Sequence, residues 1–446
     1  MSVIPSYQQV EAELLARWPE TKLDPTLERI RMLCDLMGDP QRNYPVVHLT
    51  GTNGKTSTAR MIDNLVRGLG LRTGRFTSPH VESMTERICV DGLQLTEERF
   101  AQVYAEVEPY AQIVDRTADN PLSFFEFITG MAFAEFADAP IDAAVLEVGM
   151  GGSWDSTNIA DASVAVITPI AVDHANYLGD TPADIAAEKS GIIKPGSFAI
   201  VAEQVPDAAE VVLRRAAEVG ATVAREGSEF GVIERQPGVG GQMVRLQGLF
   251  GEYAEIFLPL YGAHQAQNAG CALAAVESFA GGGDMIDIEL VRDAFAQVTS
   301  PARLEIARRS PTIVLDAAHN PHGAQATVAA VQEAFTFSPL IGVVGVMRDK
   351  DVEGLLNAFE PVMAVIVCTQ NSTPRSMPAA ELGEIAADIF GPERVEVVER
   401  LDDAIDRAAE LADDGGSYGE AIGSGGVLVT GSVITAGEAR LLVKGP

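Results

Sequence analysis

The sequence is short of basic side chains, cysteines and long apolar runs, and these shortages exclude several classes of protein. Only 32 Lys and Arg stand against 63 Asp and Glu in 446 residues, which gives a net charge of −31. This excess of acid argues against a nucleic-acid-binding surface. No window offers the ~18 uninterrupted apolar residues of a membrane span, and the first residues lack the basic and apolar regions of a signal peptide. We therefore expect neither nucleic acid nor a membrane among the partners.

The four cysteines are scattered through the chain without C-x-x-C spacing, at Cys34, Cys89, Cys271 and Cys368. A zinc site or a disulfide framework would need closer or more regular spacing. We therefore expect reduced thiols and a cytoplasmic protein. What the composition does offer is 47% hydrophobic residues, which is enough for two or three domains with full cores.

A short apolar run, a glycine-rich turn and a helical pattern follow one another near the N-terminus. Apolar residues at 45–49 predict a strand, residues 58–69 predict a helix, and the turn between them contains Gly-Thr-Asn-Gly-Lys-Thr-Ser. A phosphate-binding loop requires this order of strand, turn and helix. The two glycines are closer together than in a Walker A loop, so an ordinary strand-to-helix turn is the structural alternative.

The residue types of this turn suit a phosphate ligand. Its two glycines can take positive φ and bring backbone amides toward an anion, and the following helix adds its positive end. The lysine supplies a charge, and the two hydroxyls after it can reach a phosphate or the shell of a magnesium ion. The sequence therefore predicts a nucleotide-binding loop made of Gly51, Thr52, Asn53, Gly54, Lys55, Thr56 and Ser57.

Strand-like and helix-like segments alternate along most of the chain. Apolar strands are predicted at Ala143–Val148 and Val164–Ile167, among helical patterns at 24–38 and 124–136. Strands that are apolar throughout, rather than alternating, indicate a mostly parallel sheet that is covered on both faces. Short strand-like pieces at 229–260, broken by Pro-Gly and Gly-Gly, suggest a local antiparallel patch.

The stretch Thr299-Ser300-Pro301 is the best candidate for a domain boundary, because strand–helix alternation restarts beyond it. We predict an α/β fold with an N-terminal phosphate-loop domain at 1–298 and a smaller Rossmann-like α/β domain at 299–446. The run 413–426 is predicted to be a surface loop. The predicted strands of the second domain are Thr312–Asp316, Leu340–Val346, Val362–Cys368, Val395–Val398 and Val427–Thr430.

Polar side chains follow several of the predicted strands, where open α/β sheets bind ligands. Glu147 closes an apolar strand, and its carboxylate can hold magnesium opposite a phosphate loop, although an exposed strand-end Glu is the alternative. His174 follows another strand, and a lone His is more often structural than a ligand. Lys189 lies at a helix end, where a solvated charge is the ordinary explanation.

Eight motifs follow one another along nearly the whole chain. They are Thr50–Ser57, Thr77–His80, Leu146–Gly152, Asp173-His174, Glu188–Gly191, Gly262–Asn268, Arg303–Glu305 and Asp316–Pro321. With these motifs in this order, the chain closely resembles folylpolyglutamate synthase, including its bifunctional dihydrofolate synthase form, which is a branch of the Mur ligase superfamily.

The resemblance implies magnesium ligands at three positions of this chain. In the family, a serine, a strand-end glutamate and a histidine hold the metal, and they correspond here to Ser78, Glu147 and His174. The lysine that matches Lys189 is typically carbamylated, which turns a cation into an anion able to support a metal. That modification would explain why a lysine lies near magnesium.

The resemblance also implies nucleotide-binding and catalytic residues. Asn268 matches the amide that reads adenine, Arg303 the arginine that reaches the phosphates, and Asp316 the nucleotide-binding aspartate of the second domain. His319 and Ser432 match positions near the incoming glutamate. Asn268 as a surface amide, and Asp316 as a strand end before a helix cap, are the structural alternatives.

The activity implied is an ATP-dependent amide ligation. A folate or dihydropteroate carboxylate attacks the γ-phosphate of ATP with help from magnesium and Lys55, and L-glutamate then attacks the resulting acyl phosphate. Water would destroy that intermediate, so we expect the second domain to close over the first. Lys55, Lys189 and His319 are the expected catalytic residues, ATP and Mg²⁺ the expected cofactors, and a monomer the expected state.

Two other functions fit part of the sequence. A cell-wall Mur ligase shares the phosphate loop and the glutamate–histidine pattern, but it carries a longer N-terminal substrate domain than the ~50 residues before Gly51. A P-loop NTPase regulator would need no motifs in a second domain. The contacts to the pterin are left open between the segment Ser78–Arg87 and the aromatic run at 124–127, whose side chains can equally be core.

Overall fold

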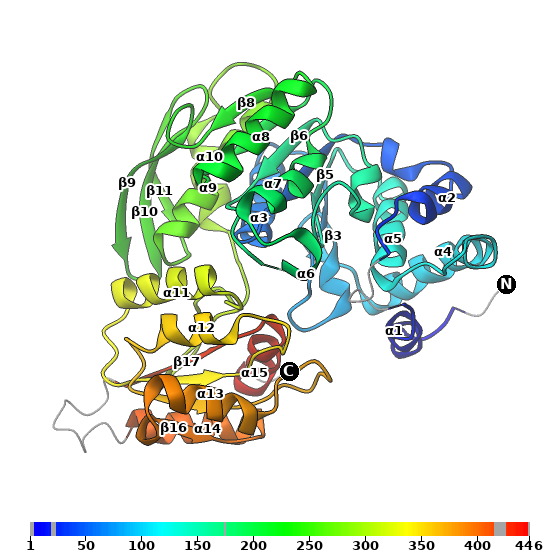
Figure 1. Ribbon diagram of the computed structural model, residues 1–446. Helices are drawn as coiled ribbons and strands as arrows, with labels where there is room; N and C mark the ends of the chain where they lie inside the picture. Colours follow the sequence, from blue (N-terminus) through cyan, green and yellow to red (C-terminus); the bar gives the residue numbers. More distant parts are fainter. Residues whose placement is uncertain (1–3, 19–23, 174, 414–424, 445–446) are drawn as a thin grey trace. The chain divides into compact units, whose positions relative to one another are not determined.

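The computed structural model describes residues 4–18, 24–173, 175–413 and 425–444 (Figure 1). His174 and most of the predicted surface loop at 413–426 lie outside the described residues. Two compact units make up the chain. The first takes Met1–Glu234, Val244–Leu258 and Ala266–Val298, and the second takes Arg235–Met243, Pro259–Gln265 and Thr299–Pro446.

An eight-stranded sheet forms the centre of the first unit. Its strands are β1 (Val46–Thr50), β2 (Thr73–Phe76), β3 (Ile88–Val90), β4 (Leu93–Gln94), β5 (Ala143–Glu147), β6 (Val164–Ile167), β7 (Phe198–Val201) and β8 (Thr222–Arg225). Their order is β4-β3-β2-β5-β1-β6-β7-β8. The six strands from β2 to β8 in this order run parallel, and β3 and β4 add an antiparallel edge. The mostly parallel sheet predicted from the apolar strands is confirmed.

Helices lie on both sides of this sheet (Figure 1). Ala144 of β5 and Ile167 of β6 belong to the hydrophobic clusters that these strands form with the surrounding helices. The helix α3 packs against β2 and β5. The helices up to residue 298 are α1 (Tyr7–Leu15), α2 (Glu28–Leu36), α3 (Lys55–Gly68), α4 (Glu97–Thr117), α5 (Phe124–Asp138), α6 (Ala175–Leu178), α7 (Pro182–Lys189), α8 (Pro206–Glu218), α9 (Ala263–Ala280) and α10 (Ile288–Ala296), with short 3₁₀ turns at η1 (Pro40–Arg42), η2 (Met84–Arg87), η3 (Ser156–Ile159) and η4 (Ser190–Ile192).

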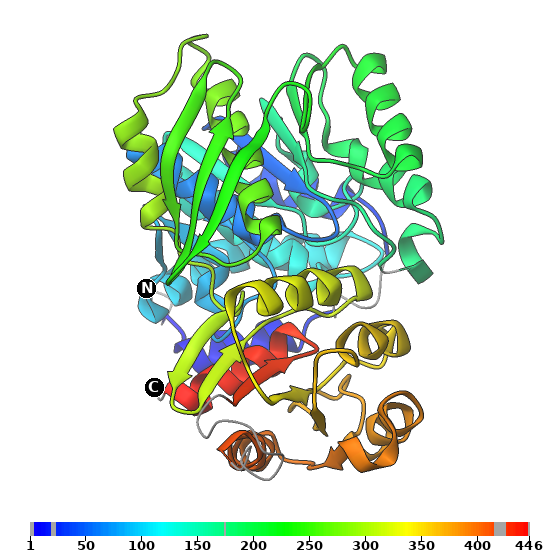
Figure 2. The same ribbon diagram turned by 90° about the vertical axis from the view of Figure 1, so that its left-hand side faces the viewer.

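The predicted patch at 229–260 forms a separate three-stranded sheet. Its strands are β9 (Gly231–Gly238), β10 (Gly241–Gln247) and β11 (Glu252–Leu258), in the order β11-β10-β9. Figure 2 shows the three arrows side by side. Both β9 and β10 contribute residues to each of the two units.

The second unit is built on a six-stranded sheet. Its strands are β12 (Glu305–Arg309), β13 (Thr312–Leu315), β14 (Leu340–Val344), β15 (Val365–Cys368), β16 (Val395–Val397) and β17 (Gly426–Thr430). In the order β12-β13-β17-β14-β15-β16, only β12 runs antiparallel to its neighbour. The five predicted strands are present, whereas β12 was not predicted.

Alternate residues of this sheet enter two different cores. Val314, Val344 and Leu428 belong to one hydrophobic cluster, while Ile313 and Val427 belong to another. The helices that supply the rest of these cores are α11 (Pro321–Ala334), α12 (Val352–Phe359), α13 (Ala379–Phe390), α14 (Leu401–Asp413) and α15 (Val433–Lys444), and η5 (Pro392–Arg394) precedes β16. A sheet buried on both faces needs apolar residues along its strands, and β13, β14, β15 and β17 provide them.

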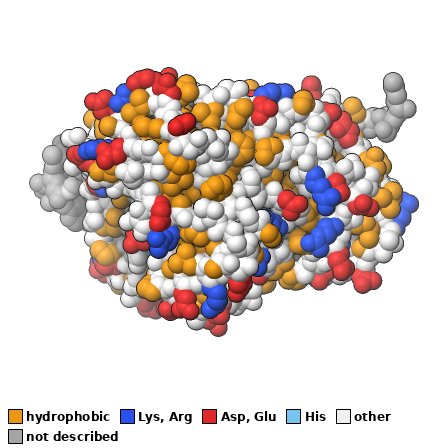
Figure 3. Space-filling model, turned by 90° about the horizontal axis from the view of Figure 1, so that it is seen from above, with side chains coloured by type: hydrophobic (Ala, Val, Ile, Leu, Met, Phe, Trp, Pro, Cys, Tyr) orange, Lys and Arg blue, Asp and Glu red, His pale blue; other side chains and the backbone are white. Residues whose placement is uncertain are grey.

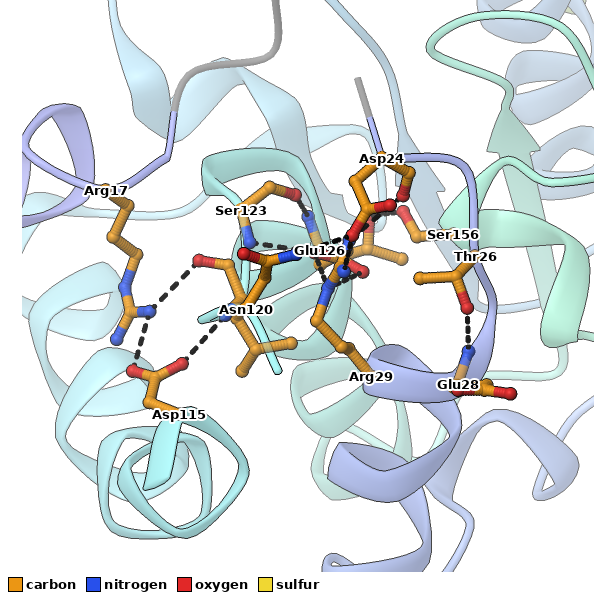
Figure 4. A network of polar contacts seen from close by, with 12 residues as sticks. Arg17, Asp24, Thr26, Glu28, Arg29, Asp115, Asn120, Ser123, Glu126 and Ser156 are labelled. Atoms are coloured by element: carbon orange, nitrogen blue, oxygen red, sulfur yellow. Dashed lines mark hydrogen bonds and ion pairs between the residues drawn. The ribbon is translucent and has the colours of Figure 1, made fainter. Parts of the chain in front are cut away.

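A polar network ties the N-terminal segment to the start of α5 (Figure 4). The buried Arg29 side chain donates from Nε to Oε1 of Glu126 at 3.0 Å and contacts Asp24 at 2.6 Å. Glu126 also accepts from the backbone amide of Ser123 at 2.8 Å, which caps the helix. The aromatic residue Phe124, which follows Ser123, is largely buried in the core of this unit.

The surface carries charges of both signs. Figure 3 shows acidic side chains spread around one face, with Lys and Arg interspersed among them. In the ranges that the structure describes, no helix has both the length and the apolar character to cross a bilayer. The four cysteines all fall within these ranges as buried, free thiols.

The buried ion pair between Asp63 and Arg75 gives a stability prediction for the first unit. The Arg75 Nη1–Asp63 Oδ2 distance is 2.5 Å, and the Asp63 side chain is fully buried. Asp63→Ala leaves a buried guanidinium without its carboxylate, so the free energy of unfolding should fall by about 3–5 kcal/mol. The control is Glu252→Ala, which removes an exposed pair with Arg245 and should cost about 1 kcal/mol or less. Urea denaturation measures both, and equal losses would contradict the prediction.

Candidate active site

The predicted phosphate loop joins β1 to α3, and its backbone is fixed by close packing. Gly51 has φ +148°, and a Cβ at this position would lie 1.9 Å from Thr168 Oγ1. Gly54 has φ +89° and caps α3, and a Cβ there would lie 2.5 Å from Asn268 Oδ1. The positive φ favours glycine at both positions, and the backbone and side chain of Thr168 leave no space for a Cβ at Gly51.

Backbone hydrogen bonds hold the loop against the segment that follows β6. The Thr52 amide donates to Pro169 O at 2.9 Å, and the Thr52 hydroxyl donates to Ala171 O at 2.8 Å. The Lys55 ammonium turns back over the loop and donates to Gly51 O at 3.0 Å and to Thr52 O at 3.3 Å. The lysine charge is thus held beside the loop, where it can attract an anion.

Three oxygen-bearing residues predicted near magnesium meet beside the loop. The Thr56 hydroxyl donates to the Glu147 carboxylate, and its oxygen lies 2.9 Å from Oε1 and 3.1 Å from Oε2. The Ser78 amide donates to Glu147 Oε2 at 3.3 Å, and the Glu147 residue is 1% exposed. The parallel register that pairs Leu49 with Glu147 brings this carboxylate to the edge where the loop begins. Carboxylate and hydroxyl oxygens are the donors that a hard cation prefers.

Lys189 ends α7 in a buried position. Its residue is 4% exposed, and burial together with the charge of Lys55 lowers its pKa to about 7. Its backbone packs closely against the loop after β5, because a Cβ at Gly152 would lie 2.7 Å from Lys189 O. A lysine whose pKa lies near 7 is unlike the solvated, fully charged lysine that helix ends usually carry.

The residues predicted for the second unit fall into two groups. The Asp316 carboxylate accepts from the Ala318 amide at 3.0 Å and from the Thr327 hydroxyl at 2.8 Å. It also accepts from the amide of Leu304, the residue that follows Arg303, at 3.0 Å. His319 donates from Nδ1 to Ala317 O at 2.9 Å, because a carbonyl can only accept. Its other ring nitrogen is then the acceptor when the ring is neutral.

Ser432 belongs to a different network in the second unit. Its hydroxyl contacts the Thr435 hydroxyl at 2.8 Å and accepts from the Thr435 amide at 3.0 Å, where it caps α15. The Asn371 amide also donates to it, at 3.4 Å. A contact between Ser432 and glutamate stays a prediction.

Asp155 and His264 are two buried groups to which the sequence analysis gave no role. Asp155 accepts from the Gly149 and Met150 amides at 3.0 Å each, so it holds the loop directly after Glu147. Burial raises its pKa to about 6. His264 is neutral, because burial lowers its pKa to about 4. The signal that could have found Asp155 is its spacing before Thr157, which is typical of a helix cap.

Two family models match the chain in regions that contain these groups. The Mur ligase middle domain matches residues 49–276, and the Mur ligase glutamate ligase domain matches residues 302–433. A dihydrofolate synthase/folylpolyglutamate synthase of Mycobacterium tuberculosis is 50% identical over 98% of this chain and 94% of its own length. The chain belongs to the folylpolyglutamate synthase/dihydrofolate synthase family of Mur ligases.

Solved structures of the family agree with this assignment. The Mycobacterium tuberculosis folylpolyglutamate synthase complexed with ADP matches with a TM-score of 0.95 at 50% identity, over 98% of both chains. The Escherichia coli protein in complex with DHPP and ADP matches with a TM-score of 0.85 at 30% identity, again over 98% of both chains. The enzyme is therefore an ATP-dependent glutamate ligase, and the alternatives of a cell-wall ligase and an NTPase regulator were wrong.

The packing of the loop predicts that Gly51→Ala strongly weakens nucleotide binding. The added methyl group would collide with Thr168, so the loop must move and its backbone amides no longer point toward the phosphate. We expect ADP to bind about 100-fold more weakly or worse, measured by titration calorimetry. Gly70→Ala is the control, because Gly70 also has positive φ, +80°, but has no atom within 4 Å of its added Cβ. Equal affinity in the two variants would contradict this account of the loop.

Proposed function

We propose that this ligase acts on both dihydropteroate and reduced folate, as a bifunctional dihydrofolate synthase and folylpolyglutamate synthase. The Mycobacterium tuberculosis relative carries both names, and the likeness covers almost the whole of each chain. The observation that carries the chemistry is the meeting of Thr56, Ser78 and Glu147 beside Lys55. An ATP γ-phosphate activated at this point can be transferred to a carboxylate.

The oxygen donors beside the loop fit a magnesium ion. Mg²⁺ is usually held by one or two carboxylates together with substrate phosphates and water, rather than by a full protein cage. Within the described ranges, no three His, Cys, Asp or Glu side chains are grouped to hold a metal. Glu147, with Ser78 and His174, is the set that we propose as ligands. When a magnesium ion is bound, it neutralises part of the phosphate charge.

The chain's own residues carry the remaining steps. Lys55, at the mouth of the loop, stabilises charge on the γ-phosphate while the acceptor carboxylate attacks it, and we propose that Arg303 assists from the second unit. The product is an acyl phosphate. The amine of L-glutamate then attacks the activated carbonyl, and phosphate leaves from the tetrahedral intermediate to give an amide. We propose that Asn268, whose side chain lies against Gly54, reads adenine, and that His319 and Ser432 act on the glutamate side.

We propose further that residues 1–298 form the ATP-binding domain and 299–446 the glutamate-ligase domain. The family models for the middle and glutamate ligase domains, at 49–276 and 302–433, support this division. A cytoplasmic monomer is also part of the proposal. The buried free thiols support a reducing compartment, and light scattering of the purified enzyme measures its oligomeric state.

The acceptor assignment predicts which substrates release ADP. With magnesium–ATP and L-glutamate, we expect ADP release with dihydropteroate and with tetrahydrofolate, and a background rate with neither. Omission of glutamate should stop net turnover, because the acyl phosphate then has no amine acceptor. A coupled assay for ADP measures all four conditions in parallel. Release with one acceptor alone would contradict the bifunctional proposal, and release without any acceptor would contradict the ligase mechanism.

The buried position of Lys189 predicts a carbamate on its amine. Only a neutral amine adds CO₂, with loss of one proton, so a pKa of about 7 leaves Lys189 reactive at pH 8 while ordinary lysines stay protonated. With ¹³C-bicarbonate, we expect one carbamate NMR signal that grows as the pH rises from about 6 to 8. The Lys189→Ala variant should lack this signal, and its kcat should be lower by about 100-fold or more. Its circular dichroism spectrum should be unchanged.

Lys194→Ala is the matched control for this experiment. Lys194 is also partly buried, burial lowers its pKa, and it donates to Asn158 O at 2.9 Å. We expect the carbamate signal to survive in this variant. Persistence of the signal in Lys189→Ala, or near-normal turnover of that variant, would overturn the carbamate proposal.

A further inference from the structure

Arg303 lies between two residues whose backbone is left-handed. Ala302 has φ +55° and Leu304 has φ +47°. Positive φ is uncommon outside glycine and persists only where the surrounding structure holds it. Both flanking side chains are buried, at 0% and 2% exposure. The turn that carries Arg303 therefore stores backbone strain, and other contacts must offset that strain.

Hydrogen bonds from three directions hold this turn. The Leu304 amide donates to Asp316 at 3.0 Å, and the Ala302 amide donates to Oε2 of Glu305 at 2.9 Å. The Ala317 amide donates to Ala302 O at 2.9 Å, and Arg303 Nη1 donates to the same oxygen at 3.0 Å. Both left-handed residues thus have an amide fixed by a carboxylate.

The Glu305 carboxylate is itself held by two cations of α15. Arg440 Nε lies 3.1 Å and 3.0 Å from its two oxygens, and the Lys444 ammonium contacts Oε1. The Glu305 side chain is 17% exposed, so these charges are only partly screened by solvent. A chain of contacts therefore runs from α15 through Glu305 to the backbone at Ala302.

We propose that Glu305 is a positioning residue that fixes the backbone of Arg303 for phosphoryl transfer. The inference rests on the proposed role of Arg303 at the ATP phosphates. Glu305 touches no reacting atom, but the loss of its charge weakens the bond from the Ala302 amide and the contacts with Arg440 and Lys444, and this loosens the strained turn. The arginine then samples positions away from the transferring phosphate, and a displacement of the order of 1 Å lowers the rate substantially.

A double-mutant cycle between Glu305→Gln and Arg303→Ala tests the proposal. We expect Arg303→Ala to lower kcat/KM for ATP by about 100-fold or more, since such arginines stabilise phosphate charge in the transition state. Glu305→Gln should lower it about tenfold in the parent enzyme and less than about twofold in the Arg303→Ala enzyme. The melting temperature should fall by the same amount in both backgrounds.

The results distinguish a failure of the inference about Glu305 from a failure of the proposed role of Arg303. An equal fold-loss from Glu305→Gln in both backgrounds, or no loss in the parent enzyme, would show that Glu305 does not act through Arg303. An unchanged kcat/KM in Arg303→Ala would overturn the role of Arg303 itself. If Glu305→Gln does not fold, Arg440→Gln replaces it in the same cycle. Glu305 then keeps its bond to the Ala302 amide but loses one of its two cations, so we expect a smaller loss in the parent enzyme and again little loss in the Arg303→Ala enzyme.

Glu396→Gln is the matched control in the same unit. Glu396 receives two hydrogen bonds from Arg407, at 2.7 and 2.9 Å, in another Arg–Glu ion pair of this unit. We expect its replacement to lower the melting temperature and leave kcat/KM for ATP unchanged. A tenfold loss in this variant would show that any weakened ion pair of the second unit impairs turnover, which would overturn the specific role of Glu305.

Discussion

The close approach of Gly51 to Thr168 is the constraint on which the active site of the first unit depends. The Thr168 amide bonds to Thr50 O at 2.8 Å, so the ends of β1 and β6 are locked together immediately before their loops diverge. Glu147 lies on the other neighbour of β1, in register with Leu49. Parallel strands end at one edge of a sheet. The positions of the loops after β1, β5 and β6 therefore depend on how these strands are held together, more than on the sequences of the loops.

The parts of this site that follow from the sequence are those determined by burial on both faces of a sheet. β1, β5 and β6 are apolar at nearly every position, and each predicted strand matches the observed one to within one or two residues. A carboxylate at the end of β5 then had to lie near the loop after β1, because the two strands are neighbours. The family resemblance supplied the residue roles, which no spacing alone could indicate.

The parts that the sequence did not predict depend on contacts between distant residues. Ala302 and Leu304 carry no local signal for positive φ, and their conformation is held by Asp316 and Glu305. The strand β12 is polar and lies at a sheet edge, so it lacks the apolar run that revealed its neighbours. Local propensity is overridden at such places by tertiary hydrogen bonds.

A chain with a net charge of −31 needs local cations to bind a triphosphate, and we propose Lys55 for this role. Lys55 and Lys189 repel each other when both are charged, and burial adds to the cost of charging Lys189. A neutral Lys189 removes that repulsion, and a carbamate would replace it with attraction. The same burial that makes an ammonium costly at this position therefore makes the amine nucleophilic. The low pKa and the proposed modification thus have one physical cause, the exclusion of water around the end of α7.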